Sequence, residues 1–391
     1  MIKMNSPFGS YTLLRYPLKK KETLQAWDAA DEYLLAYLKE LFDQLPNDNA
    51  ESAKNILIIN DNFGALTLSL HSYSPTVQND SYVSQQGILA NLEKNGLDHH
   101  KINFLSSTEP LQNAFNYVLI KIPKSNAYLE DVLCSLQSHI NPDTKIISAA
   151  MSKNIHTNTL KIFEQTIGDT TTSLAKKKAR LVFSQFTNKS QHTNTANSYT
   201  HPVTSFELAL EDKTFTIQNY SNVFSREKLD IGTRFLLENL PASKEINTII
   251  DLGCGNGILG LVAAHQHPTA NIIFVDESYM AVESAKLNFK TAFKENNRQA
   301  TFIASNCLGT LEENSVDLIL CNPPFHQNHA IGDHIAWQMF NDAHKVLKKE
   351  GELWIVGNHH LAYHAKLKTI FGGYSVVNSN KKFAIMFSRK T

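Results

Sequence analysis

The chain has 391 residues, of which 42% are hydrophobic and 19% charged, so it is long enough for two globular domains and too apolar to be disordered. Lysine plus arginine and aspartate plus glutamate number 37 each, so the net charge gives no argument for a nucleic-acid partner. No apolar stretch reaches the roughly 20 residues of a membrane span, and Met1–Tyr16 lacks the pattern of a secretory leader, so we expect a cytoplasmic protein with no membrane partner.

Both halves of the chain alternate short apolar runs with longer segments of helical pattern. This alternation is typical of βαβ units, so we predict an α/β protein with two tandem Rossmann-like domains, each a mostly parallel, doubly wound sheet. Asn, Thr, Ser, Gln and His crowd together between Thr187 and Ser205, which favours a linker there. The predicted organisation is a first domain over residues 1–186, a linker over 187–205 and a second domain over 206–391.

The first domain repeats features of the second domain in the same order. Setting Gly64 on Gly257 places Asn60 and Asn62 opposite two further glycines of the second domain. We interpret the repeat as a duplication whose first copy is degenerate; the alternative is that two doubly wound domains are alike without common origin. The matched segments are Ile56–Leu70 with Ile249–Ala264, Asn79–Tyr82 with Asp276–Tyr279, and Val118–Lys124 with Leu318–Pro324, the last setting Lys121 on Cys321.

In the second domain, short strands are expected at Phe215–Gln218 and Asn222–Phe224, before a helix over Gly232–Leu240. The strands of the main sheet and the helices between them follow from apolar runs and helical periodicity. The strands are expected at Asn247–Leu252, Ile272–Val275, Thr301–Ser305, Val316–Cys321 and Gly351–Val356, the helices at Ile258–His265, Ser278–Phe293 and Ile335–Lys348, and a closing antiparallel hairpin at Tyr374–Asn378 and Lys382–Ser388.

A glycine-rich turn follows the strand expected at Asn247–Leu252. It contains Gly253, Gly255 and Gly257 directly after Asp251. Glycines at the start of a helix let the backbone approach a ligand closely, so the turn indicates a nucleotide-type pocket. An NAD site ranks second, because the spacing is not that of the dinucleotide fingerprint.

The next predicted strand ends at Asp276, 19 residues after Gly257. A carboxylate at this position can accept hydrogen bonds from both ribose hydroxyls of an adenosine. The alternative, which the sequence leaves equally open, is that Asp276 caps the helix starting at Ser278.

Asn322-Pro323-Pro324-Phe325 follows the strand expected at Val316–Cys321, at the sheet edge where open α/β folds place ligands. Two prolines fix the backbone, so the Asn322 amide oxygen and the Pro323 carbonyl can accept from one exocyclic amino group while Phe325 stacks on the base. In isolation the tetrapeptide fits a simple proline turn. After the glycine turn and Asp276, it favours methylation of an amino nitrogen.

These motifs resemble those of class I S-adenosylmethionine-dependent methyltransferases with an Asn-Pro-Pro-Phe/Tyr motif. Within that family the chain is similar to the ribosomal RNA guanine-N2 methyltransferases with two tandem methyltransferase-like domains, and more to the large-subunit branch than to the small-subunit branch. The resemblance extends over nearly the whole chain and is carried by Leu24–Leu35, Asn222–Ser225, Leu229–Gly232 and Asn322–Gln327.

The resemblance implies a role for each motif residue. It implies that S-adenosylmethionine is the cofactor and that the first domain docks RNA. The sequence does not determine the oligomeric state, for which a monomer is favoured. Gly253, Gly255 and Gly257 would lie under the methionine part of the cofactor, Asp251 near its amine, Asp276 at the ribose, Ser305 and Asn306 near the adenine, and Asn322, Pro323 and Phe325 at the target guanine, with Asn322 also beside the cofactor. Asn306 stands where the family often has an acidic side chain.

The expected activity is therefore methyl transfer to N2 of a guanosine in large-subunit (23S) rRNA. Alternatives are the same reaction on small-subunit (16S) rRNA, methylation of a protein glutamine at N5, and a non-enzymatic RNA-binding assembly factor with a relic pocket.

Other features carry less weight. Four widely spaced cysteines fit neither a zinc site nor a disulfide framework, and His360 and His364 share a helical spacing without a carboxylate, so no metal is expected. The basic segment Lys176–Arg180 is equally consistent with contacts to phosphates and with the solvent-exposed start of a strand. Trp337 fits either core packing or RNA contact.

Overall fold

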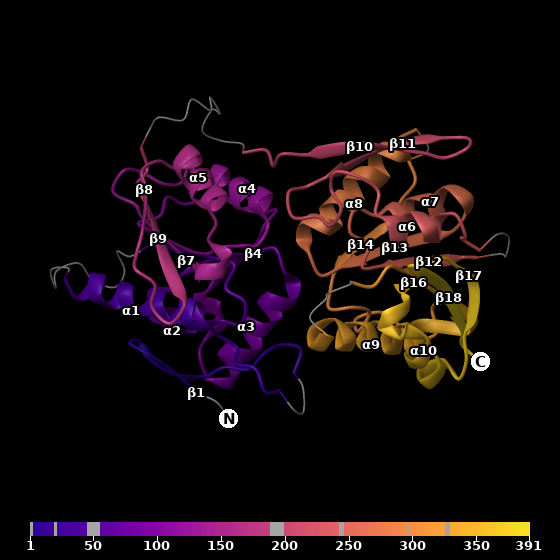
Figure 1. Ribbon diagram of the computed structural model, residues 1–391, viewed down its shortest axis with the longest axis horizontal. Helices are drawn as coiled ribbons and strands as arrows, with labels where there is room; N and C mark the ends of the chain where they lie inside the picture. The colour runs from indigo at the N-terminus through magenta and orange to yellow at the C-terminus, as the bar shows by residue number, and fades with distance from the viewer. Residues whose placement is uncertain are drawn as a thin grey trace. The chain divides into compact units, whose positions relative to one another are not determined.

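The computed structural model describes residues 3–18, 22–44, 55–187, 199–241, 246–295, 297–324 and 329–391, without the side chains of 329–333. It divides into two compact units, Met1–Pro202 and Val203–Thr391 (Figure 1). Each unit holds a seven-stranded sheet and a separate two-stranded hairpin. Among the described residues, no helix combines the length and apolar character needed to cross a membrane.

The second unit is a doubly wound sheet in the order β14-β13-β12-β15-β16-β18-β17, parallel except for β18, which pairs antiparallel with β16 and β17. Helices α6, α7 and α8 cover one face, and α9 and α10 the other (Figure 1), each over its own apolar core. The elements are β10 (Thr204–Ala209), β11 (Thr214–Asn219), α6 (Ile231–Leu237), β12 (Thr248–Leu252), α7 (Ile258–Gln266), β13 (Asn271–Asp276), α8 (Tyr279–Ala292), β14 (Thr301–Ala304), β15 (Val316–Cys321), α9 (His329–Val346), β16 (Leu347–Asn358), η5 (His359–Leu361), α10 (Tyr363–Phe371), β17 (Ser375–Ser379) and β18 (Phe383–Arg389).

The first unit has the corresponding order β5-β4-β3-β6-β7-β9-β8, parallel except for β9, which pairs antiparallel with β7 and β8. The predicted α/β class with two tandem domains is confirmed. Its elements are β1 (Lys3–Ser6), β2 (Gly9–Thr12), α1 (Ala29–Asp43), β3 (Ile56–Ile59), α2 (Ala65–Ser69), η2 (His71–Tyr73), β4 (Thr76–Asn79), α3 (Tyr82–Lys94), η3 (His99–Lys101), β5 (Asn103–Ser106), β6 (Tyr117–Lys121), α4 (Asn126–Leu136), β7 (Lys145–Met151), η4 (Ser152–Asn154), α5 (Thr157–Thr166), β8 (Thr170–Thr172) and β9 (Ala179–Ser184).

Some predicted boundaries were wrong. Asn222–Phe224 forms turns, not a strand, and Thr204, expected in the linker, already pairs with Asn219 in the β10–β11 hairpin. Helix α6 begins one residue before Gly232, because the Asp230 carboxylate caps it. Strand β16 is longer than expected and takes the last two residues predicted for the preceding helix, because it pairs with β15 from its first residue.

In each unit a buried asparagine bonds the backbone near the end of the hairpin segment, on β11 in the second unit and two residues after β2 in the first. In the second unit, the Asn288 side chain accepts from the Gln218 N–H (2.7 Å) and donates to the Gln218 carbonyl (2.9 Å). In the first unit, Asn91 does the same with Leu14, at 2.9 and 2.8 Å. Identical strand orders and the same pair of asparagine hydrogen bonds support a duplication over a chance likeness of doubly wound domains.

The strand register corrects one of the sequence alignments between the units. β3 pairs Ile59 with Ile120, and β12 pairs Leu252 with Cys321. Since Ile59 corresponds to Leu252, the next residue on β6, Lys121, corresponds to the asparagine of the Asn-Pro-Pro-Phe motif and not to Cys321. The sequence alignment was wrong by one residue because it matched prolines, and the first copy has one more residue before its proline.

Candidate active site

The glycine turn between β12 and α7 is closely packed at one glycine and exposes its backbone at another. Gly253, Gly255 and Gly257 all have left-handed φ values, of +71°, +52° and +80°. A Cβ on Gly257 would lie 2.7 Å from the Ala285 Cβ, whereas no described atom outside its own neighbours lies within 4 Å of a Cβ on Gly255. Gly257 therefore permits α7 and α8 to pack, and Gly255 leaves space in front of the turn.

This difference gives a matched pair of variants. Gly257→Ala adds a clash to the strain of a positive φ and should destabilise the unit by about 3 kcal/mol, whereas Gly255→Ala adds only the backbone strain of about 1 kcal/mol. The unfolding temperature of the two variants measures the difference. Equal losses would show that Gly257 is not held against α8.

Asp251, at the end of β12, is fully buried with one oxygen unused. Its Oδ2 accepts from the Gly260 N–H at 2.8 Å, and its Oδ1 has no hydrogen-bond partner among the described residues. Burial, with a smaller contribution from the charge of Asp276, raises the pKa of Asp251 to about 8. A buried acid with a free oxygen is suited to receive a cationic group.

Asp276, at the end of β13, supports the glycine turn. Its Oδ2 accepts from the Gly255 N–H at 2.9 Å and its Oδ1 from the Ser278 N–H at 3.0 Å. The cap of α8 is the Ser278 hydroxyl, which accepts from the Ala281 N–H, so the alternative role of Asp276 as the helix cap is wrong. Burial raises the pKa of Asp276. Each carboxylate oxygen can accept a second hydrogen bond.

Ser305 and Asn306 follow β14 beside Asp276. The Ser305 N–H donates to the Asp276 carbonyl at 2.9 Å, and Ser305 is buried. The Asn306 side-chain oxygen accepts from Gln338 of α9 at 3.1 Å. The structure thus brings the ends of β12, β13 and β14 together at one edge of the sheet.

Asn322 lies immediately after β15, the neighbour of β12. Its side-chain nitrogen donates to the Thr233 hydroxyl at 2.9 Å and to the Asp230 carboxylate at 3.2 Å. Its oxygen is buried and has no hydrogen-bond partner within the described part of the chain. Pro323 is buried directly after it. Phe325, predicted to stack on the base, lies outside the described residues, as do the neighbouring residues 326–328.

Unpartnered buried oxygens are concentrated at this edge. The described residues contain four buried side-chain polar atoms without a partner, and two of them are Asp251 Oδ1 and Asn322 Oδ1. Such atoms are costly in a folded protein unless a ligand satisfies them. β12 and β15 are adjacent parallel strands, so both oxygens belong to the same edge of the sheet.

Comparison with known proteins assigns the family. The family described as "RLMG N-terminal domain" matches residues 1–188, and "Methyltransferase small domain" matches residues 214–387. The chain is 47% identical to the ribosomal RNA large subunit methyltransferase G of Aeromonas salmonicida, over 96% of both chains. It is 44% identical to that of Pseudoalteromonas translucida, over 97% of this chain and 96% of the relative. The chain belongs to the ribosomal RNA large subunit methyltransferase G family.

A solved structure shares the fold of this methyltransferase over its whole length. It is the T. thermophilus 16S rRNA N2 methyltransferase RsmC, determined with AdoMet and guanosine. The match has a TM-score of 0.74 at 20% identity and covers 100% of this chain and 98% of the other. The two-domain architecture is therefore that of a known methyltransferase.

Two residues at the site of the methyltransferase were missed by the sequence reasoning. Asp230 and Thr233 lie on the first turn of α6 and contact Asn322, although the chain separates them from it by 92 and 89 residues. The sequence signal was an aspartate at the cap of a helix three residues before a threonine. That signal predicts a helix start and gives no indication of its distant partner.

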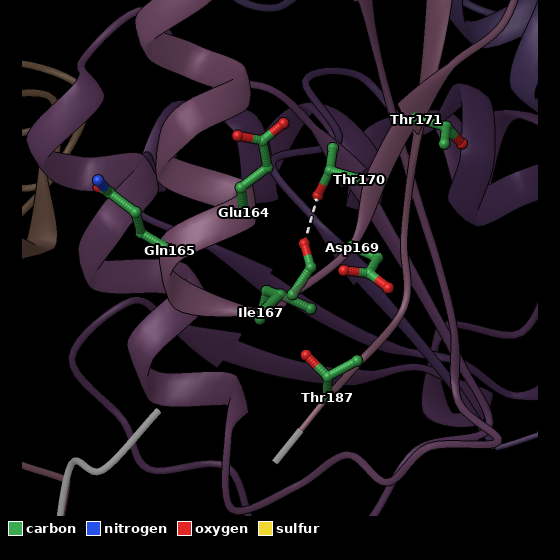
Figure 2. A pocket seen from close by; sticks show the side chains of 8 residues that line it. Glu164, Gln165, Ile167, Asp169, Thr170, Thr171 and Thr187 are labelled. Atoms are coloured by element: carbon green, nitrogen blue, oxygen red, sulfur yellow. Dashed lines mark hydrogen bonds between the residues drawn. The ribbon is translucent and has the colours of Figure 1, made fainter. Parts of the chain in front are cut away.

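Two other features of the methyltransferase lie in the first unit. Figure 2 shows a pocket lined by Glu164, Gln165, residues 167–171 and Thr187. Exposed Glu164 and Asp169 face solvent, and the Thr170 hydroxyl donates to the Gly168 carbonyl at 2.9 Å. None of the lining residues was predicted to act in function.

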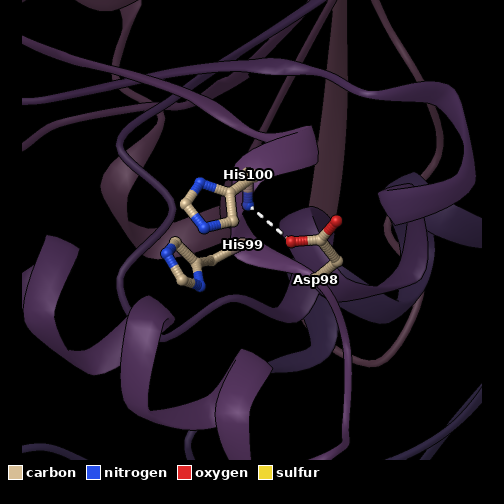
Figure 3. Close-up of side chains that lie close together, drawn as sticks. All are labelled: Asp98, His99 and His100. Atoms are coloured by element: carbon tan, nitrogen blue, oxygen red, sulfur yellow. Dashed lines mark hydrogen bonds between the residues drawn. The ribbon is translucent and has the colours of Figure 1, made fainter.

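The second feature is a group of possible metal ligands formed by Asp98, His99 and His100 (Figure 3). All three are exposed neighbours around one short turn, and the Asp98 carboxylate accepts from the His100 N–H at 3.0 Å. Three exposed side chains from one turn do not form a closed metal site.

Proposed function

We propose that this protein transfers the methyl group of S-adenosylmethionine to the exocyclic N2 of a specific guanosine in large-subunit (23S) rRNA. Family membership over nearly the whole chain supports the reaction class and the large-subunit substrate. The observation that carries the chemistry is the Asn322 oxygen, a buried acceptor without a partner among the described residues. A ribosomal RNA substrate also supports a cytoplasmic location.

The Asn322 oxygen and the Pro323 carbonyl would bind the two hydrogens of the guanine amino group. Holding both hydrogens turns the nitrogen lone pair out of conjugation with the ring and toward the methyl group. Asn322 and Pro323 would hold the nitrogen in this orientation while it takes the methyl group that bound S-adenosylmethionine would supply and gives up one of its protons. Two fixed acceptors stabilise the positive charge that develops on nitrogen, so orientation and electrostatics supply most of the rate gain.

The residues at the sheet edge fit a sulfonium nucleoside with an amino-acid tail. S-adenosylmethionine supplies the electrophilic methyl group when it is bound. The open space at Gly255 and the free oxygen of Asp251 are the observations that support the fit. In this proposal the cofactor contacts the backbone of Gly253, Gly255 and Gly257, the carboxylates of Asp251 and Asp276, the loop Ser305–Asn306, and Asn322.

The first unit is proposed to dock RNA without binding cofactor. At the position of Asn322 it has Lys121, whose ammonium lies 2.9 Å from the Asp28 and 2.6 Å from the Asp31 carboxylate. Burial raises the pKa of Asp31 to about 6. Asn60, at the position of the first glycine, accepts from the Tyr128 hydroxyl at 3.1 Å. In the first unit, therefore, the residues at the positions of Asn322 and the first glycine are bonded to other side chains of the same unit.

We therefore expect one S-adenosylmethionine per chain. Isothermal titration calorimetry of the full chain should give a stoichiometry of one, and Asp276→Ala should weaken that single site because it loses the ribose acceptor and the support of the glycine turn. A second cofactor bound per chain would contradict the assignment of the first unit as degenerate.

The substrate can be tested directly. Purified protein with labelled S-adenosylmethionine should methylate 23S rRNA from cells lacking the protein, and mass mapping should place the label on one guanosine N2. Labelling of 16S rRNA or of glutamine in total protein would instead support one of the alternative substrates. Failure to bind the cofactor would support a non-enzymatic RNA-binding factor.

A further inference from the structure

We propose that Asp230 and Thr233 are positioning residues that fix the orientation of the Asn322 amide, so that its oxygen faces the substrate. The inference rests on the proposed function, because it assigns a task to groups that contact Asn322 at that same site.

The first turn of α6 forms a small network with Asn322. The Asp230 Oδ2 caps α6 by accepting from the Thr233 N–H at 2.9 Å, and it also lies 3.4 Å from the Thr233 hydroxyl, which donates to it. That hydroxyl accepts from the Asn322 nitrogen at 2.9 Å, and the same nitrogen donates to Asp230 Oδ2 at 3.2 Å. The Asn322 nitrogen therefore donates one hydrogen bond to a carboxylate oxygen and one to a hydroxyl.

An asparagine amide has nearly the same shape when its oxygen and nitrogen exchange places, so packing alone does not fix its orientation. A carboxylate can only accept hydrogen bonds. If the amide turned over, the Asn322 oxygen would face the Asp230 carboxylate without a hydrogen between them. The network therefore favours the orientation in which the oxygen is left for the substrate.

The first unit keeps the same contact with different chemistry. Asp28 caps α1 as Asp230 caps α6, and Asp31 is the third residue of α1 as Thr233 is of α6. Both accept from Lys121, the residue at the position of Asn322. Lysine offers donors only, so this copy presents no acceptor.

The two units share the position of this contact but differ in its hydrogen-bonding groups. The contact between the first helix and the end of the fourth strand persists in both units, so it belongs to the fold. Only the second unit combines a neutral hydroxyl at the third helical position with an amide at the end of the strand. That combination engages the amide nitrogen and leaves its oxygen free.

Thr233→Val tests the inference, because it keeps the shape of the side chain and removes its hydroxyl. We expect kcat for methylation of rRNA to fall about tenfold or more, with the Kd for S-adenosylmethionine changed less than about twofold. Thr233→Ser should restore kcat to within about threefold of the native value. Thr369→Val removes an exposed hydroxyl from α10 that bonds within its own helix, and it should leave kcat unchanged.

Asp230→Asn provides the second variant. Asparagine caps helices about as well as aspartate, so α6 should remain folded. Its amide can donate as well as accept, so the Asn322 amide is no longer confined to one orientation, and kcat should again fall while the cofactor Kd holds. Native kcat in both Thr233→Val and Asp230→Asn would overturn the inference.

A second readout does not depend on activity. The Asn322 side-chain NH2 should show slow solvent exchange by nitrogen-15 NMR in the native protein and in Thr233→Ser, and faster exchange in Thr233→Val. Unchanged exchange in Thr233→Val would overturn the inference even if the enzyme methylated no RNA. Slow native exchange in an inactive protein would overturn the proposed function and leave the positioning intact.

Discussion

Asn322→Ala should lower kcat for methyl transfer to rRNA by about 100- to 1000-fold, because it removes an acceptor fixed where positive charge develops on nitrogen. The backbone of Pro323 remains as a single acceptor, so the amino group is no longer held by both hydrogens. The rate of labelled methyl transfer at saturating cofactor measures the loss.

Folding and cofactor binding provide the controls for this variant. Asn322 contributes two hydrogen bonds to Asp230 and Thr233, so its removal should cost about 1 to 2 kcal/mol of stability. The Kd for S-adenosylmethionine, from calorimetry, should change by less than about threefold. Turnover near the native rate in a folded variant would remove the assigned role of Asn322.

The second large effect is the pH dependence of stability caused by Asp251. Burial raises the pKa of Asp251 to about 8 in the folded protein, whereas an unfolded aspartate has a pKa of about 3.9. Between these values the folded state holds a proton that the unfolded chain has released. The contribution of Asp251 to stability is therefore fully present below about pH 4 and is lost as the pH rises to about 8.

Asp251→Asn isolates this contribution, because the amide resembles the protonated acid and does not titrate. Relative to the native protein, the free energy of unfolding of the variant should rise by about 1.4 kcal/mol per pH unit between pH 5 and pH 7. Denaturant unfolding followed by fluorescence of Trp354, which is buried in the same unit, measures the difference. Parallel pH profiles would mean that Asp251 is ionised in the folded protein.

The sequence predicted the architecture well where the pattern was strong. The continuous apolar run Leu318–Cys321 lies in a central strand, since strands covered on both faces need apolar side chains. Weak patterns failed. Asn222–Phe224 has strand-like residues but forms turns. The alignment of Lys121 was wrong because a match of prolines concealed the register.

The sequence predicted which residues belong to the candidate site but not which of their side-chain atoms have hydrogen-bond partners. Asp251 and Asn322 were predicted at the sheet edge, and the structure places them there. Among the described residues each has one oxygen without a partner, which depends on the groups that the fold brings near. Asp230 and Thr233 reach Asn322 only through the packing of α6. No local pattern encodes such a contact.

A crystal structure with S-adenosylhomocysteine and guanosine tests the central claim most directly. We expect the guanine N2 to lie about 2.8–3.1 Å from the Asn322 oxygen, with the nitrogen facing the sulfur of the cofactor product. Guanosine bound elsewhere, or an Asn322 oxygen that remains without a partner while both ligands occupy the site, would contradict it.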